Sequence, residues 1–157
     1  MKDHRQDKST NREWDEEGLI DRARAAIQYA YAPYSGYRVG AAVRWESGRI
    51  TSGGNIENSS YGLTVCAERV ALYKGIADGE SRPAALAVAV QATVLPVPCG
   101  ACRQVMTEWA NDLPIYLVNG QGEVRRTELL RIFPEAFGAD HLESSETRRN
   151  PKEEGRT

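Results

Sequence analysis

Residues 66–104 read CAERVALYKGIADGESRPAALAVAVQATVLPVPCGACRQ, and this stretch decides the fold. Apolar residues recur at helical spacing over Cys66–Ala77, and an Asp-Gly pair then ends the segment. A run rich in Ala, Val and Leu follows over Ala84–Ala92, between two prolines, which is typical of a strand buried on both faces. Cys99–Ala110 is again helical in pattern. A helix, a buried strand and a second helix in succession predict an α/β domain.

The flanking segments extend this unit on both sides. Apolar residues form a helical stripe over Trp14–Tyr31, and Pro33 ends that helix. Tyr37–Trp45 and Arg49–Gly54 have strand character and flank a glycine-containing turn, which predicts an antiparallel hairpin. Towards the other end we expect a strand over Ile115–Val118, a strand around Val124 and a short helix over Thr127–Phe133. This order predicts a three-layer α/β/α sandwich with a mixed five-stranded sheet.

The composition fits one folded domain between two polar ends. The chain has 157 residues and a mass of 17.4 kDa, and its 41% of hydrophobic residues suffice for a core. Residues 1–13 and 143–157 are polar and charged, so they cannot offset their ordering entropy by burial. We therefore expect two disordered tails around a single domain over residues 14–142.

Charge and hydropathy restrict the location and the partners. No apolar run approaches the roughly 20 residues that cross a bilayer, and the polar N-terminus has no apolar signal-peptide core. We therefore expect a cytoplasmic protein without a membrane partner. The formal net charge is −2 and the pI is about 5.8, whereas proteins that follow a phosphate backbone carry excess positive charge. Nucleic acid is therefore not an expected partner.

The distribution of cysteine and histidine restricts the available chemistry. The three cysteines, Cys66, Cys99 and Cys102, stand at the starts of predicted helices, where the helix dipole and free N–H groups stabilise thiolates. Both histidines lie in the polar ends, so residues 5–140 contain no imidazole. This excludes from the folded body a Ser-His-Asp triad, a His-paired cysteine nucleophile and a His-ligated zinc site. A bound metal ion would be held mainly by sulfur.

The spacing of the cysteines suits such a metal site. Cys99 and Cys102 are three residues apart, so one helical turn places both sulfurs on the same side, and Cys66 would join them from the neighbouring helix. Three sulfur ligands leave the fourth position of a tetrahedral zinc ion open, as in catalytic sites. Glu68 follows Cys66 closely and is placed to move protons at that position. A Cys-x-Glu followed by Pro-Cys-x-x-Cys is the signature of zinc deaminases acting on cytosine or adenine.

Other interpretations of these residues are less specific. A Cys-x-x-Cys motif alone is typical of structural zinc sites and of redox dithiols. A structural site needs a fourth Cys or His, which the body of this chain lacks. The alternative for Glu68 is a favourable charge in the first turn of a helix, and the alternative for Arg69 is an ordinary surface arginine.

Four motifs carry a resemblance to a known family. They are YAPYSGYRVGAA over Tyr31–Ala42, GNIENSSY over Gly54–Tyr61, CAER over Cys66–Arg69 and PCGACRQ over Pro98–Gln104. From about Leu19 to Leu142 the chain resembles cytidine deaminases of the small homotetrameric class, which implies a cytidine deaminase-like fold. The resemblance implies that the three cysteines bind one zinc ion per chain and that Glu68 is the catalytic proton carrier. It also implies that Arg69 hydrogen-bonds a zinc-bound sulfur and offsets the negative charge of the site.

The resemblance also assigns substrate contacts. Asn55 and Glu57 match residues that hold a hydroxyl of the ribose, a task that suits an amide and a carboxylate. Tyr37 replaces the more usual Phe that lines the base pocket. The backbone N–H of Ala67 is implied as a donor to the oxygen of the cytosine ring.

Two aromatic residues are implied to act across a subunit boundary. By the same resemblance Phe137 stacks on the base in a neighbouring subunit's site, and Tyr61 approaches a neighbour's sugar. Both roles require the homotetramer that the resemblance implies.

The resulting prediction is an enzyme, a zinc-dependent cytidine deaminase of pyrimidine salvage. It converts cytidine and 2′-deoxycytidine to uridine and 2′-deoxyuridine and releases ammonia. A carboxylate near the sugar favours a free nucleoside over a nucleotide as the small-molecule partner. Two alternatives remain, namely a deaminase of a related cytosine nucleoside or aminated heterocycle of the blasticidin type, and a non-enzymatic zinc-stabilised module. The acidic pI disfavours a polynucleotide deaminase.

Overall fold

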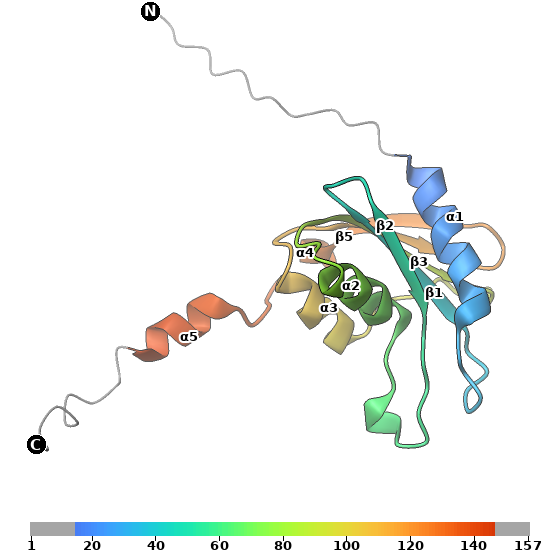
Figure 1. Cartoon of the computed structure of the whole chain (residues 1–157), viewed down its shortest axis with the longest axis horizontal. Helices are drawn as coiled ribbons and strands as arrows, with labels where there is room; N and C mark the ends of the chain where they lie inside the picture. The colour runs from blue at the N-terminus through green and yellow to red at the C-terminus, as the bar shows by residue number, and fades with distance from the viewer. Residues whose placement is uncertain (1–14, 147–157) are drawn as a thin grey trace, which may run out of the picture.

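The computed structural model describes residues 15–146 of the chain (Figure 1). Its first half contains α1 (Glu16–Ala26), the 3₁₀ turn η1 (Ile27–Tyr29), β1 (Val39–Trp45), β2 (Ile50–Gly54), the 3₁₀ turn η2 (Tyr61–Leu63) and α2 (Ala67–Ala77). Its second half contains β3 (Pro83–Val90), α3 (Gly100–Thr107), β4 (Pro114–Val118), β5 (Val124–Glu128), α4 (Leu129–Ile132) and α5 (Ala139–Glu146). Up to α4 the order of helices and strands is the predicted one.

The strands form one mixed sheet of five strands in the order β2-β1-β3-β4-β5. β1 pairs antiparallel with both β2 and β3, and β5 pairs antiparallel with β4. β3 and β4 are parallel, because the connection through α3 returns the chain to the same end of the sheet. α1 covers one face, and α2 and α3 cover the other (Figure 1). The predicted three-layer α/β/α sandwich is therefore confirmed.

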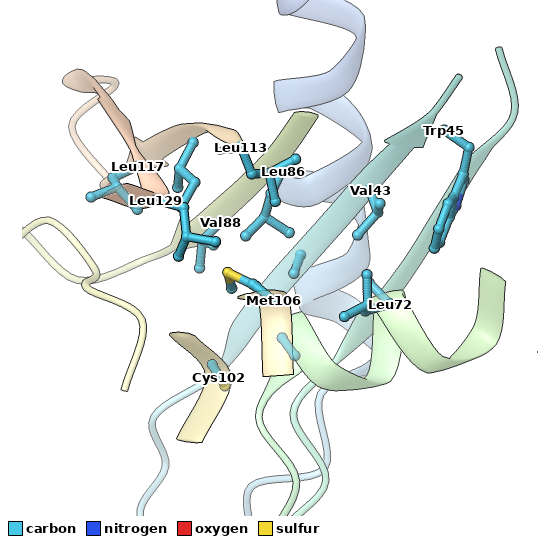
Figure 2. Packing of buried hydrophobic residues seen from close by; sticks show 14 residues of the cluster. Val43, Trp45, Leu72, Leu86, Val88, Cys102, Met106, Leu113, Leu117 and Leu129 are labelled. Carbon is cyan, nitrogen blue, oxygen red and sulfur yellow. The ribbon is translucent and has the colours of Figure 1, made fainter. Parts of the chain in front are cut away.

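Apolar clusters fill the space on both faces of the sheet. On one face Leu86 and Val88 of β3 lie in the same cluster as Met106 of α3, with side chains from α2 beside them (Figure 2). On the other face Ala87 of β3 packs in a cluster with Leu19 of α1. Because β3 contributes alternate side chains to the two clusters, it is buried on both faces, as its sequence predicts.

Some element ends differ from the predicted ones. The helix expected over Trp14–Tyr31 gives way to η1, and Tyr31 is already extended, because its N–H donates to the carbonyl of Asn55 at 2.8 Å. Thr127 and Glu128, expected at the start of a helix, instead end β5, where they pair with β4. In both places a backbone partner far away in the sequence overrides the local helical pattern.

The ends of the chain are only partly described. α5 is an additional helix, and it includes residues 143–146, which were expected to begin a disordered tail. The rest of that tail, residues 147–157, and the tail expected over residues 1–13 lie outside the described residues. In the described part of the chain no helix combines the length and the apolar composition needed to cross a bilayer.

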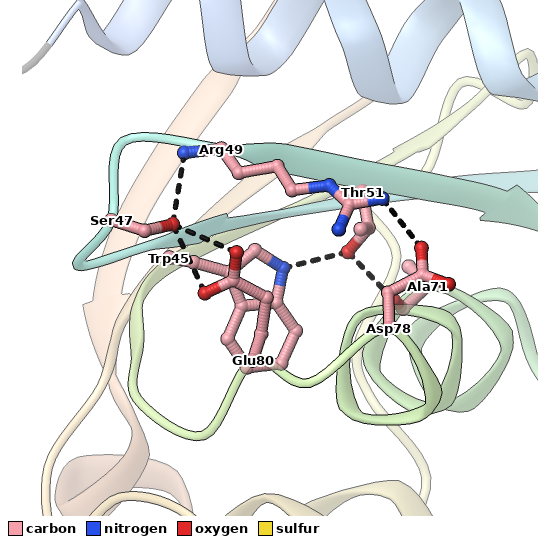
Figure 3. A network of polar contacts seen from close by, with 7 residues as sticks. All are labelled: Trp45, Ser47, Arg49, Thr51, Ala71, Asp78 and Glu80. Atoms are coloured by element: carbon pink, nitrogen blue, oxygen red, sulfur yellow. Dashed lines mark hydrogen bonds and ion pairs between the residues drawn. The ribbon is translucent and has the colours of Figure 1, made fainter.

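Trp45 ties the hairpin to α2. Its indole Nε1 donates to the Thr51 hydroxyl at 2.8 Å, and that hydroxyl donates to the Ala71 carbonyl at 2.8 Å (Figure 3). The ring is fully buried, and a Cβ added at Gly75 of α2 would lie 2.0 Å from it. Only glycine allows this close approach of the helix to the indole.

We expect Gly75→Ala to lower the free energy of unfolding by about 1–3 kcal/mol, the usual cost of overpacking a core. The loss occurs although alanine is intrinsically the better helix former. Urea unfolding measures it, with Gly62→Ala as the control, because a Cβ at Gly62 would meet nothing within 4 Å. The control should change stability by less than about 0.5 kcal/mol. Equal stability of the two variants would mean that the indole simply moves aside.

Candidate metal centre

The first residues of α2 and α3 bring the three cysteines together. Cys66 immediately precedes α2 and Cys99 immediately precedes α3, both with extended backbone geometry. Cys102 lies in the first turn of α3 and is buried. α2 runs towards the start of β3 and α3 begins after its end, so both helices start near the carboxyl end of this strand. The three sulfur atoms consequently lie within 4.8 Å of one another.

The sulfur spacing fits a tetrahedral zinc ion. With Zn–S bonds of about 2.3 Å, two sulfur ligands at the tetrahedral angle are about 3.8 Å apart. The Sγ atoms of Cys66 and Cys99 are separated by 3.8 Å. Since the sequence contains no further cysteine, three sulfurs can occupy three corners and leave the fourth corner to another ligand.

The three thiols need a cation in order to ionise together. A hydrogen bond from the Cys102 thiol lowers the pKa of Cys66 to about 5, and Arg69 adds to this effect. The same hydrogen bond, together with burial, raises the pKa of Cys102, because a second thiolate beside the first is unfavourable. A divalent metal ion supplies the charge that compensates all three thiolates, so the donor set suits zinc.

Arg69 lies beside the thiols, in the first turns of α2. Its Nη2 donates to the Thr64 carbonyl at 3.3 Å and contacts Cys66 Sγ at 3.8 Å. Its Nε is buried and has no hydrogen-bond partner among the described residues. A guanidinium held in this position balances the negative charge of thiolate ligands.

Glu68 is the buried carboxyl group of the site, with 5% of its surface exposed. Burial raises its pKa to about 7, and the charge of Cys66 acts in the same direction. A carboxyl group with this pKa accepts and donates protons efficiently near neutral pH. Burial, and secondly the charge of Glu68, raises the pKa of the Tyr37 phenol. Ala67 opens α2, where a backbone N–H has no acceptor within the helix.

Asn55 directly follows β2 and is buried against the chain that leads into β1. Its Oδ1 accepts from the Val39 N–H at 2.9 Å, and its Nδ2 donates to the Tyr37 carbonyl at 2.9 Å. An amide side chain has one further N–H and one further lone pair. Asn55 therefore holds the backbone of Tyr37, and its amide has the capacity for one further donated and one further accepted hydrogen bond.

Glu57 lies two residues further on and lines a cavity of about 330 Å³. The other residues around this cavity are Tyr34, Ser35, Tyr61 and Thr64. The Ser35 hydroxyl donates to the Glu57 carboxylate, and this hydrogen bond is the main reason why the pKa of Glu57 is lowered. The Glu57 side chain is therefore an ionised hydrogen-bond acceptor.

Tyr61 and Phe137, the two aromatic residues expected at a subunit boundary, differ in their position relative to the cavity lined by Glu57. Tyr61 is 75% exposed, lines the Glu57 cavity of its own chain and packs edge-on against Tyr34, with 6.0 Å between ring centroids. Phe137 follows α4, is 57% exposed and stacks on His141, with 5.2 Å between ring centroids. Within one chain the structure thus brings Tyr61, but not Phe137, to the cavity beside Glu57.

Ser35 is a residue of this region that the sequence patterns did not single out. The available signal was the pair Ser35-Gly36, because Gly36 has φ of 67° and marks a tight turn. The partner of the Ser35 hydroxyl, Glu57, is 22 residues away, and local spacing does not indicate such a contact.

Comparison with known proteins places the chain in a family. The family model described as "Cytidine and deoxycytidylate deaminase zinc-binding region" matches residues 12–117. A curated cytidine deaminase of Sporosarcina psychrophila is 44% identical over 129 residues, which cover 82% of this chain and 95% of that protein. The cytidine deaminase of Halalkalibacterium halodurans is 46% identical over 130 residues, covering 82% and 98% of the two chains.

Solved structures give the same result. A crystal structure of cytidine deaminase from Burkholderia pseudomallei superposes with a TM-score of 0.76 at 45% identity, covering 79% of this chain and 100% of that chain. The cytidine deaminase of Mycobacterium tuberculosis superposes with a TM-score of 0.70 at 38% identity, covering 80% and 98%. The family resemblance, the fold class and the zinc cofactor expected from the sequence are therefore confirmed. The chain belongs to the cytidine and deoxycytidylate deaminase family and carries its zinc-binding region.

Proposed function

We propose that this chain catalyses the zinc-dependent hydrolytic deamination of cytidine and 2′-deoxycytidine in pyrimidine salvage. The products are uridine or 2′-deoxyuridine and ammonia. The observation that carries the proposal is the buried carboxyl group of Glu68 beside three converging thiols. Three sulfur ligands and a carboxyl group that is not a ligand form the set with which zinc deaminases remove a ring amine. The similarity to curated cytidine deaminases supports cytosine nucleosides as the substrate class.

In this proposal Cys66, Cys99 and Cys102 hold the zinc ion from the starts of two helices. When bound, zinc supplies Lewis-acid chemistry that brings the pKa of water towards neutrality. Three thiolates and one Zn²⁺ carry a net charge of −1, which opposes this effect. The positive charge of Arg69, which contacts Cys66, offsets part of this negative charge.

Glu68 moves the protons of the reaction. It accepts a proton from the water that attacks C4 of the base and donates this proton to N3. It then accepts the remaining proton of the new C4 hydroxyl and donates it to the departing amine, so that the carbonyl forms as ammonia leaves. One carboxyl group serves for both tasks because acceptance and donation follow each other. Burial raises the pKa of Glu68 to about 7, so neither direction of transfer is strongly uphill near neutral pH.

The sugar and the base are recognised by four further residues. Asn55 and Glu57 bind a sugar hydroxyl, for which the ionised carboxylate is the acceptor and the free N–H of the amide is a donor. Tyr37, whose carbonyl accepts a hydrogen bond from Asn55, lines the base pocket. The N–H of Ala67, at the start of α2, donates to the O2 atom of cytosine.

The assembly belongs to the same proposal. Several large apolar side chains are exposed in the part of the chain that runs from η1 through η2, among them Tyr29, Tyr31, Ile56, Tyr61 and Leu63. Such a group of exposed apolar side chains favours burial against other subunits. In a homotetramer Phe137 and Tyr61 would contribute to a neighbour's site. The homotetramer and the cytoplasmic location remain predictions.

Turnover of a substrate panel by protein of known zinc content tests the proposal. Ultraviolet absorbance would follow loss of the cytosine amine from cytidine, 2′-deoxycytidine, cytidine 5′-monophosphate and blasticidin S. We expect both nucleosides to be deaminated and the nucleotide to have a kcat/KM lower by about 10²-fold, because like charges at a binding site cost several kcal/mol. Glu57→Gln should narrow this difference.

Each alternative has its own outcome in the same panel. Turnover of blasticidin S alone would identify a deaminase of a related aminated heterocycle. Full zinc content without release of any amine would indicate a zinc-stabilised module that is not an enzyme.

A further inference from the structure

The turn before β1 is built around the hydroxyl of Ser35. This hydroxyl accepts a hydrogen bond from the Tyr37 N–H at 3.0 Å and donates one to Oε1 of Glu57. Gly36 between them has φ of 67°, a conformation that favours glycine. Ser35 therefore connects a carboxylate that lines the cavity to the backbone of Tyr37.

A second Ser-Gly turn with the same hydrogen bonds lies in the hairpin between β1 and β2. The Ser47 hydroxyl accepts from the Arg49 N–H at 3.3 Å and donates to both oxygens of Glu80, at 2.8 and 3.0 Å (Figure 3). Gly48 between them has φ of 88°. The two Ser-Gly turns differ in their surroundings, since Glu80 lies outside the proposed site and Glu57 lines its cavity.

The hydrogen bonds of Glu57 leave one acceptor position open. A carboxylate has about four lone-pair sites, two on each oxygen. Oε2 accepts from the Tyr34 N–H at 2.8 Å and from the Ser35 N–H at 3.2 Å, so both of its sites are used. Oε1 accepts only from the Ser35 hydroxyl among the described residues. The remaining site is therefore on the oxygen that this hydroxyl holds.

The Ser35 hydroxyl also helps to fix the direction of that free site. The Glu57 main chain is fixed, because its N–H donates to the Tyr31 carbonyl at 2.8 Å. The two carboxylate oxygens turn together about the last side-chain bond, so the two N–H groups on Oε2 and the Ser35 hydroxyl on Oε1 fix this torsion jointly. Without the hydroxyl, Oε1 loses its only hydrogen-bond partner among the described residues, and the direction of the free site is held less tightly.

We propose that Ser35 is a positioning residue for substrate selectivity, whose hydroxyl aims Oε1 of Glu57 at a hydroxyl of the nucleoside sugar. The inference rests on the proposed function, in which Glu57 binds the sugar. It extends that function by naming the group that orients this contact. Ser35 itself touches neither the base nor the zinc ligands in this proposal.

The test compares a substrate that has the sugar hydroxyls with one that lacks them. Sugar selectivity is the kcat/KM for cytidine divided by that for 2′,3′-dideoxycytidine. We expect Ser35→Ala to lower this selectivity about threefold to tenfold, the net contribution of a typical hydrogen bond, because the contact between Glu57 and the sugar is misdirected rather than removed. The loss should come mainly from a higher KM for cytidine, with turnover of dideoxycytidine unchanged. 2′-Deoxycytidine and 3′-deoxycytidine then identify the hydroxyl concerned.

Two further variants separate positioning from folding. Ser35→Thr keeps the hydroxyl at an exposed position and should retain the wild-type selectivity. Ser47→Ala removes the matching hydrogen bonds of the other Ser-Gly turn and should leave the selectivity unchanged. A Ser35→Ala enzyme that loses cytidine and dideoxycytidine turnover equally would overturn the proposal, because a merely structural turn has that effect.

The remaining outcomes distinguish this inference from the proposed function. A selective wild-type enzyme whose selectivity survives Ser35→Ala would refute the role of Ser35 and leave cytidine deamination intact. A wild-type enzyme that deaminates both substrates equally well would refute sugar binding by Glu57 and the role of Ser35 with it. Protein that holds zinc and deaminates neither substrate would refute the proposed function itself.

Discussion

Glu68→Gln is expected to lower kcat on cytidine by about 10³- to 10⁴-fold, the upper range for losing a general acid–base group. Glutamine has nearly the same size and fills the same buried position, but it cannot carry a proton between water and the base. The loss should appear in kcat more than in KM, because the missing interactions form on the way to the transition state. Steady-state kinetics on cytidine, followed by ultraviolet absorbance, measure it.

Zinc content and a second carboxamide variant are the controls for this result. Glu68→Gln should retain about one zinc ion per chain, because Glu68 is not among the three cysteines proposed as ligands. Glu80→Gln makes the same chemical change at a carboxylate bound to Ser47, outside the proposed site, and should keep wild-type kcat. If Glu68→Gln keeps its zinc and its kcat falls by less than about tenfold, another group must carry the proton.

The parts of the molecule that could be predicted from the sequence depend on short-range patterns. The run over Ala84–Ala92 indicates a strand buried on both faces, and the structure places β3 in the middle of the sheet. Cys99 and Cys102 share one turn, and Cys66 and Glu68 share another, so each pair follows from helix geometry alone. Only the approach of the two turns required an assumption about topology, and the convergence of the sulfurs agrees with it.

The parts that could not be predicted depend on contacts between distant residues. Tyr31 leaves helical geometry because its backbone pairs with the segment after β2. Ser35 meets Glu57 across 22 residues, and no spacing rule connects them. The short helix before Pro134 begins later than its pattern suggests, because Thr127 pairs with Ile115 of β4. Sheet pairing and side-chain partners at this separation become visible only in the folded chain.

Cys102→Ala is expected to lower the zinc content from about one ion per chain to below about a tenth, with loss of cytidine turnover in proportion. Cys102 is fully buried, whereas Cys66 and Cys99 are not, and it lies in the cluster that joins α3 to the sheet (Figure 2). With this ligand removed, only Cys66 and Cys99 remain, and two sulfurs do not form a closed zinc site. Alanine is small and apolar, so the variant adds no polar group to the core.

Removal of the metal should also lower the stability of the fold. This effect distinguishes the role of Cys102 as a zinc ligand from its role in core packing. Bound zinc stabilises the folded state by RT ln(1 + [Zn]/Kd), about 4 kcal/mol at a free concentration 1,000 times Kd. A chelator should therefore lower the unfolding temperature of the wild-type protein and leave that of Cys102→Ala unchanged. Met106→Leu is the matched control, because Met106 lies one turn later in the same cluster and the exchange nearly conserves volume. This control should keep its zinc and its chelator response. Stoichiometric zinc in Cys102→Ala would exclude Cys102 as a ligand, and zinc loss in Met106→Leu would assign the effect to core packing instead.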